Sequence, residues 1–126
     1  MQILVDSSVW VDFFRGGPKT SRLRLFIKEN IVVTNDLILA ELIPPLKIRK
    51  QSKLISLMKA LARLELKIDW DQIIDYQHRC LKKGINGVGI PDLIIAQNAV
   101  QNDCEIYSFD QHFKLMKNAI RIRTLP

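Results

Sequence analysis

The chain has 126 residues, 48% of them hydrophobic and 25% charged, which is typical of one globular domain. No apolar run approaches the roughly 18 residues that span a bilayer, and Asp6 interrupts the first run, so we expect no membrane segment, no secretory signal and a cytoplasmic location. The net charge of +6 favours a polyanionic partner such as nucleic acid, although solvated helix faces explain any single basic cluster equally well. Cys80 and Cys104 lack metal-ligand spacing and are interpreted as reduced core residues.

The first sixteen residues predict a strand, a turn, a helix and a stop. Residues 3–5 form a short apolar run typical of a strand buried on both faces, and helical apolar spacing follows over residues 9–14 before Gly16. Asp6 lies between them. In open α/β folds ligands bind at the carboxyl ends of strands, so Asp6 is a candidate site residue. The alternative is that Asp6 or Ser7 merely caps the helix.

The rest of the chain alternates between predicted helices and strands. Apolar spacing predicts helices over residues 19–29, 50–64, 71–83, 92–102 and 113–116. Short apolar runs predict strands over residues 31–33, 65–70, 106–109 and 120–122. A further helix follows the capping residues 34–36, and we expect it to end or kink just past Glu41 because of Pro44 and Pro45. This alternation predicts a single domain over residues 1–126, a three-layer α/β/α sandwich with a mostly parallel central sheet.

Three acidic residues stand alone in apolar surroundings: Asp6, Glu41 and Asp92. An isolated buried carboxylate is costly unless something charged offsets it, so three in one small domain suggest a shared cation. Asp110 is a fourth candidate because it follows a predicted strand, as Asp6 does. Oxygen ligands without suitably spaced His or Cys indicate Mg²⁺ or Mn²⁺, ions that commonly bind phosphate.

Four segments occur in a distinctive order: VDSSVWVDFFRG, a Glu in an apolar helix at position 41, PDLIIAQNA and IYSFDQHF. This order resembles a PIN domain, and more narrowly the VapC toxins of bacterial and archaeal toxin–antitoxin pairs. By position, Asp6, Glu41, Asp92 and Asp110 match the acidic quartet of that family. Ser8 matches its small hydroxyl or amide residue.

The resemblance implies a metal-dependent endoribonuclease that hydrolyses phosphodiester bonds in RNA, with Mg²⁺ or Mn²⁺ as cofactor. Asp6 and Asp92 would hold the metal most directly, while Glu41 and Asp110 would orient or deprotonate the attacking water. Ser8 would hydrogen-bond a carboxylate or the scissile phosphate. The implied partners are an RNA substrate, either tRNA or ribosomal RNA, and a cognate VapB-like antitoxin, and we also expect a homodimer.

Two further residues depend on the same resemblance. Arg15 falls where the family carries Arg-Gly and would contact substrate or partner, a surface ion pair being the alternative. His112 stands where many members carry another carboxylate, and it is interpreted as an ordinary half-buried imidazole. The competing hypothesis for the whole chain is a catalytically silent PIN-fold nucleic-acid-binding module. All four acids are present, which favours the enzyme.

Overall fold

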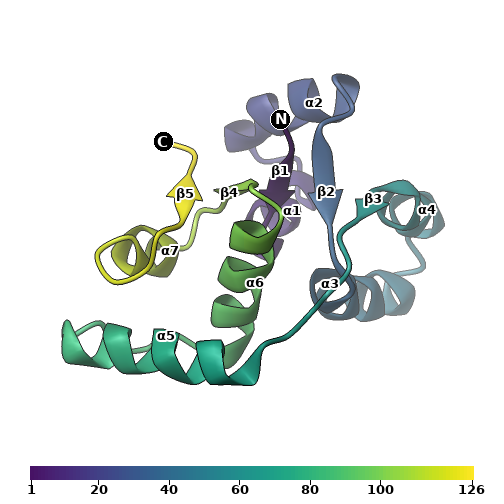
Figure 1. Ribbon diagram of the computed structural model, residues 1–126. Helices are drawn as coiled ribbons and strands as arrows, with labels where there is room; N and C mark the ends of the chain where they lie inside the picture. The colour runs from purple at the N-terminus through teal and green to yellow at the C-terminus, as the bar shows by residue number, and fades with distance from the viewer.

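The computed structural model describes residues 1–126, with a five-stranded sheet at its centre in which every neighbouring pair is parallel. The strand order is β3-β2-β1-β4-β5 (Figure 1). The strands are β1 (Ile3–Val5), β2 (Val32–Thr34), β3 (Ala62–Arg63), β4 (Glu105–Tyr107) and β5 (Arg123–Thr124). Parallel neighbours cannot be joined by a hairpin, so each connection crosses over and carries helix. The predicted α/β/α architecture is confirmed, with a sheet that is wholly parallel.

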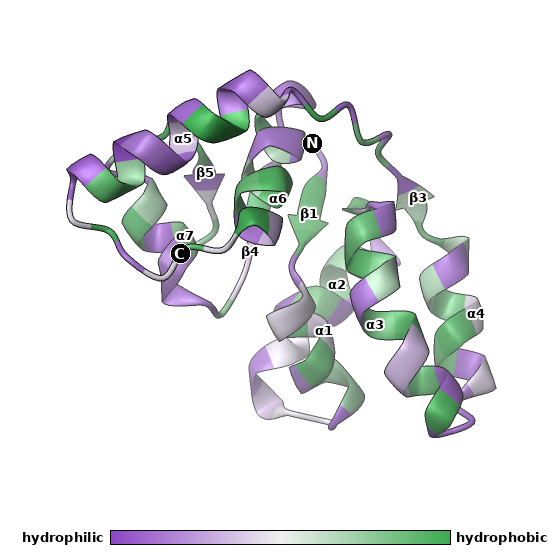
Figure 2. Ribbon diagram, turned by 90° about the horizontal axis from the view of Figure 1, so that it is seen from below, coloured by the Kyte–Doolittle hydropathy of each residue, from purple (hydrophilic) through white to green (hydrophobic).

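Seven α-helices and one 3₁₀ turn, Pro18–Thr20, fill these connections. The helices are α1 (Ser7–Phe14), α2 (Ser21–Lys28), α3 (Asp36–Ile48), α4 (Ser52–Ala60), α5 (Trp70–Lys82), α6 (Ile90–Gln101) and α7 (Gln111–Met116). Helix α6 lies on one side of the sheet and α1 on the other (Figure 1), while α5 packs on α6 and α4 on α3. Green and purple turns alternate along α5 in Figure 2, as expected of an amphipathic helix. None of the seven is long and apolar enough to cross a bilayer.

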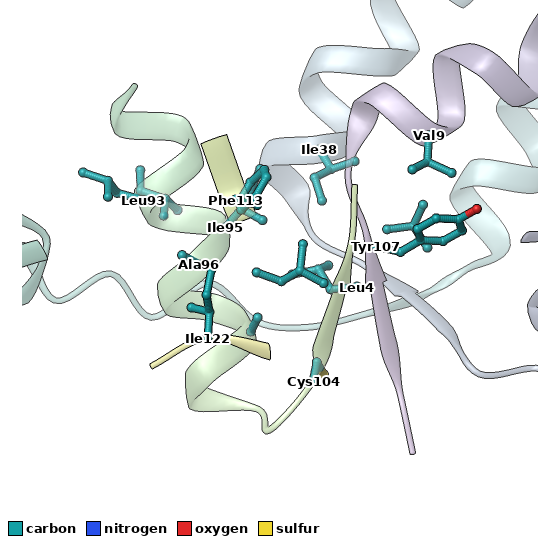
Figure 3. Packing of buried hydrophobic residues seen from close by; sticks show 14 of the residues in the cluster. Leu4, Val9, Ile38, Leu93, Ile95, Ala96, Cys104, Tyr107, Phe113 and Ile122 are labelled. Atoms are coloured by element: carbon teal, nitrogen blue, oxygen red, sulfur yellow. The ribbon is translucent and has the colours of Figure 1, made fainter. Parts of the chain in front are cut away.

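The hydrophobic core lies on both faces of the central strands. Leu4 points toward the α6 side, where Ile95 and Ala96 lie, whereas Tyr107 points to the opposite side, toward Val9 of α1 (Figure 3). All five residues are buried, which explains why β1 reads as an uninterrupted apolar run. The two cysteines are buried free thiols, as expected from their sequence context.

Helix α3 continues through the proline pair at 44–45, so it does not end just past Glu41, the first of the two outcomes predicted there. The helix runs to Ile48. Proline removes two backbone hydrogen bonds to carbonyls four residues back, but the prolines lie on the exposed side, where water can hydrate those carbonyls. Leu42 and Leu46, one turn apart, are both 5% exposed and pack the same turns onto the core. Tertiary burial therefore outweighs the local preference of proline.

Two predicted strands were also misplaced. The edge strand near the middle of the chain is 62–63, not 65–70, because the helix before it ends at Ala60 and the Leu64 amide already bonds to the end of β2. The last strand is 123–124 rather than 120–122. The apolar residues that suggested the latter are buried, but they pack in the turn that precedes the strand. The apolar pattern over residues 120–122 correctly predicted buried side chains, but the backbone of these residues is not part of the sheet.

A buried pair of asparagines ties α3 to α6. The Asn35 side-chain amide donates to Asn98 Oδ1 at 2.9 Å, while Asn35 Oδ1 accepts the Ile38 amide and so caps α3. The Asn98 amide donates to the Glu65 carbonyl at 3.0 Å. Both asparagines are at most 1% exposed. The pair therefore ties the start of α3, the helix that carries Glu41, to the C-terminal half of α6, the helix that carries Asp92.

Replacing Asn98 with Leu should lower the free energy of unfolding by about 1–3 kcal/mol, because the side-chain amide of the fully buried Asn35 would lose its hydrogen-bond partner. Urea unfolding with an unchanged m-value measures this loss. The matched control is Gln101→Leu, which removes an exposed bond to the Lys67 carbonyl and should change stability by less than about 0.5 kcal/mol. Equal losses in the two variants would contradict a structural role for the asparagine pair.

Candidate functional site

Asp6 lies at the carboxyl edge of the sheet, between β1 and α1, and is 5% exposed. Its backbone amide donates to the Tyr107 carbonyl at 2.9 Å, which places it beside the end of β4. Asp6 occupies the position of a helix cap, but its carboxylate makes no capping bond. Instead Oδ2 accepts the hydroxyls of Ser8, at 2.9 Å, and Ser108, at 2.8 Å. The capping interpretation of this side chain is therefore wrong.

The two serines form a cradle for that carboxylate. Ser8 Oγ accepts the Phe109 amide at 3.0 Å, and Ser108 Oγ accepts the Asp110 amide at 2.9 Å. Because each hydroxyl has one proton, and the amides occupy an acceptor position, that proton is free to be donated to Asp6. Ser8 thus hydrogen-bonds a carboxylate, one of its two expected roles. Sequence analysis missed Ser108 because it placed this residue inside the predicted strand 106–109, whereas β4 ends at Tyr107.

Asp110 and His112 form a second part of the site at the start of α7. Asp110 Oδ1 accepts the His112 amide at 2.9 Å, and His112 Nδ1 lies 2.9 Å from the same oxygen. One ligand atom each from Asp92, Asp110 and His112 lies within 4.8 Å of the other two. A Cβ added to Gly87, whose φ is +83°, would lie 3.2 Å from His112 Nε2, so the loop before α6 approaches the imidazole closely. Sequence analysis interpreted His112 as an ordinary half-buried imidazole, although its position is one where many proteins of the resembled family carry a carboxylate.

Two of the four acids, Asp92 and Glu41, have pKa values raised by burial and by neighbouring carboxylates. Burial raises the pKa of Asp92, and the charges of Asp110 and Asp6 raise it further, against smaller lowering effects of the Gly89 backbone and His112. Burial likewise raises the pKa of Glu41, followed by the charges of Asp6 and Asp92. No lysine or arginine lies within 4.0 Å of any of the four carboxylates. The charges of these carboxylates therefore act on one another without a lysine or arginine in contact with any of them.

This donor set fits a divalent cation. Carboxylate oxygens suit Mg²⁺ and Mn²⁺, and an imidazole beside them is compatible with a transition metal such as Mn²⁺. The acids reach the site from four places in the chain: the end of β1, the middle of α3, the first turn of α6 and the start of α7. Asp6 and Glu41 are not part of the group of three residues whose ligand atoms lie within 4.8 Å of one another, and they are linked to it by the effects of charge on pKa. Glu41 also lines a pocket between α1, α3 and α4, which Arg15 borders as well.

Comparison with known proteins identifies the fold. The family model described as PIN domain matches residues 3–118. VapBC2 from Rickettsia felis, solved on a DNA fragment from its promoter, aligns with a TM-score of 0.77 at 20% identity, covering 99% of this chain and 98% of that one. DNA-bound VapBC from Salmonella typhimurium gives 0.76 at 16% identity, covering 99% and 97%.

A third solved structure is described as a toxin that cleaves the sarcin–ricin loop: VapC20 from Mycobacterium tuberculosis, with a TM-score of 0.65 at 17% identity, covering 97% of this chain and 99% of that one. No curated protein sequence matches the chain. At these identities the structural neighbours establish a shared fold over essentially the whole chain, while the family model matches almost its full length.

Proposed function

The chain belongs to the PIN-domain family, and on that premise we propose that it is a metal-dependent endoribonuclease, the toxin of a toxin–antitoxin pair. The observation that carries the proposal is the convergence of Asp6, Glu41, Asp92 and Asp110 without a lysine or arginine in contact. Like charges that lie close together destabilise a fold, and a catalytically silent binding module does not require them. A basic chain of net charge +6 around an acidic site suits a polyanion bound through a cation.

We infer a role for each side chain from its position. Asp6 and Asp92 would hold Mg²⁺ or Mn²⁺, with Ser8 and Ser108 fixing the orientation of the Asp6 carboxylate. Glu41 and Asp110 would accept hydrogen bonds from the attacking water and take its proton, a task that suits the raised pKa of Glu41. When bound, the metal supplies a lowered pKa for that water and positive charge for the phosphate.

The partners in this proposal are an RNA, a VapB-like antitoxin and a second copy of the chain. Two of the solved structures with this fold are described as VapBC complexes bound to DNA, which supports a protein partner of the antitoxin kind. The structure described as a toxin cleaving the sarcin–ricin loop supports RNA as the substrate class, with ribosomal RNA and tRNA as the first candidates. The site of action would be the cytoplasm.

The direct test incubates the purified chain with tRNA and with ribosomal RNA, in Mg²⁺, in Mn²⁺ and in EDTA. We expect endonucleolytic fragments in either metal and none in EDTA, with activity restored when metal is added back in excess. RNA fragments that persist in EDTA would indicate a contaminating metal-independent ribonuclease. Intact RNA under every condition, with a folded protein that nevertheless binds RNA, would favour the silent binding module.

A further inference from the structure

Phe109 combines an exposed aromatic ring with a place inside the candidate active site. It stands in the chain between Ser108, whose hydroxyl donates to Asp6, and Asp110. The backbone amide of Phe109 donates to Ser8 Oγ at 3.0 Å, and that hydroxyl is the second donor to Asp6. The backbone of Phe109 is therefore held by the same group of hydrogen bonds that orients a carboxylate proposed to hold the metal.

The exposure of this ring is unusual for the chain. Phe109 is 41% exposed, whereas the other four phenylalanines are buried or half-buried. Among phenylalanine, tyrosine and tryptophan only Trp70 is more exposed, at 56%. A single exposed apolar side chain needs no explanation by itself. Phe109, however, is the chain neighbour of an acid in the candidate site, and the proposed chemistry gives its ring no role.

A buried aromatic neighbour supports the Phe109 ring from one side. Its centroid lies 5.6 Å from that of Tyr107, at an interplanar angle of 87°. Tyr107 is 4% exposed, packs edge to face with Phe26 and donates its hydroxyl to the Lys19 carbonyl at 3.3 Å. An edge-to-face contact leaves at least one face of the Phe109 ring free of Tyr107. A supported ring of this kind costs little conformational entropy when a flat ligand stacks on it.

An exposed aromatic ring beside a site for phosphate matches a nucleobase. Proteins that bind single-stranded RNA stack unpaired bases on aromatic side chains. Such a contact needs one ring and accepts any base, because every base has a π-face. In the proposed function a phosphate of the RNA binds through the metal at the acids, so the bases on either side of that phosphate come closest to Phe109.

We propose that Phe109 stacks on an unpaired base next to the scissile phosphate and so holds that phosphate at the metal. The inference rests on the proposed function, because it takes RNA as the substrate. It narrows the substrate class to RNA that is single-stranded at the point of cleavage, since a base inside a duplex is already stacked on its neighbours. The contact secures the strand without selecting its sequence.

The competing occupant of this ring is an apolar side chain of a protein partner. An aromatic side chain buries about 150–250 Å² at most, whereas a standard protein interface takes about 800 Å² from each partner and has an apolar centre. The residues that flank Phe109 directly in the chain are polar: Ser108, Asp110 and Gln111. One ring with polar neighbours matches the area of one base better than the centre of a protein interface.

The test uses the full chain carrying Asp6→Asn, in Mn²⁺, so that RNA stays intact. Two single strands of equal length are compared by fluorescence anisotropy: an ordinary RNA and a ribose-phosphate strand without bases. Adding Phe109→Ala should weaken the ordinary strand about 5- to 150-fold, the range for one stacked base, and leave the strand without bases unchanged. Adding Phe109→Trp instead, which keeps an aromatic ring, should preserve the affinity for both strands.

The matched control is Trp70→Ala, which removes the other exposed aromatic ring. Trp70 begins α5, and the backbone of the preceding residue, Asp69, bonds to Gln97 in the C-terminal half of α6. Asp92 lies in the first turn of α6, at the opposite end of that helix. Trp70→Ala should therefore bind both strands as tightly as the Asp6→Asn chain does.

Three results overturn the stacking role: equal weakening of the two strands by Phe109→Ala, unchanged binding of both, or no preference of the Asp6→Asn chain for the strand with bases. Unchanged binding leaves a protein partner as the occupant of the ring. RNA cleavage by the unmodified chain in Mn²⁺ is scored separately. Cleavage without an effect of Phe109→Ala on binding removes the stacking contact alone, whereas intact RNA in both metals removes the proposed nuclease.

Discussion

Asp6→Asn should reduce RNA cleavage by about 100-fold or more, with little change in fold. The substitution removes one of the two carboxylates proposed to hold the metal, and losing about 3 kcal/mol of charge stabilisation in the transition state accounts for a factor of this size. The side chain keeps its shape, and the hydroxyls of Ser8 and Ser108 can still bond to the amide that replaces the carboxylate. Initial rates of RNA cleavage in saturating Mn²⁺ measure the loss.

The control for this prediction is Asp71→Asn, which removes an exposed acid in the first turn of α5 that contributes to the pKa of neither Glu41 nor Asp92. Its cleavage rate should equal that of the unmodified chain. A full rate in Asp6→Asn after careful repurification would show that the observed nuclease does not use this site.

Asp92→Asn should melt at a higher temperature than the unmodified chain in EDTA and gain less from added Mn²⁺. Burial raises the pKa of Asp92, and the charges of Asp110 and Asp6 raise it further. The folded protein therefore disfavours the ionised form of this side chain. Removing that charge relieves the repulsion. In the unmodified chain Mn²⁺ at a hundred times its Kd should add about 2.7 kcal/mol of stability, and the variant should lose much of this gain.

The difference in melting temperature between Asp92→Asn and the unmodified chain should depend on pH. A carboxyl whose pKa is raised on folding binds more protons in the folded chain than in the unfolded one, so its contribution to stability is lost as the pH rises through the raised pKa. The advantage of Asp92→Asn in EDTA should therefore shrink as the pH falls toward about 4, the value for an unperturbed Asp. Calorimetric melts across this range measure it.

The opposite result has a clear meaning. If Asp92 served only as an acid in the first turn of α6, its replacement would cost about 0.3–1 kcal/mol through the helix dipole, with or without metal. A lower melting temperature in EDTA, together with an undiminished Mn²⁺ shift, would therefore leave Asp92 as a helix-terminal acid and remove it from the proposed metal site.

The parts of the site that follow from short stretches of chain could be predicted from the sequence. Asp6 was selected because an apolar run ends on it, and Asp92 because it stands alone in apolar surroundings. The helix that carries Asp92 begins at Ile90, two residues before the predicted start at 92. In each case the signal lies within a few residues of the candidate side chain.

The parts that depend on contacts between distant residues could not be predicted. Nothing near Ser108 in the chain indicates that its hydroxyl reaches Asp6, and nothing near His112 indicates that the imidazole joins Asp92. The proline pair in α3 was misjudged for the same reason, because the burial of Leu42 and its neighbours comes from the rest of the fold. Local pattern identifies candidate residues, whereas the sheet order decides which of them meet.

The hydrogen bond between Ser108 and Asp6 joins residues that are far apart in the sequence, which has a consequence for the synthesis of the chain. β1 leaves the ribosome before the other four strands of the sheet, yet it pairs with β4, and the serine that bonds to Asp6 follows 102 residues later. At about 5–20 residues per second, this interval lasts roughly 5–20 s. Throughout it the nascent chain has no Asp110 and no complete cradle for Asp6. A translation product that stops before β4 therefore carries three of the four acids but cannot assemble the site.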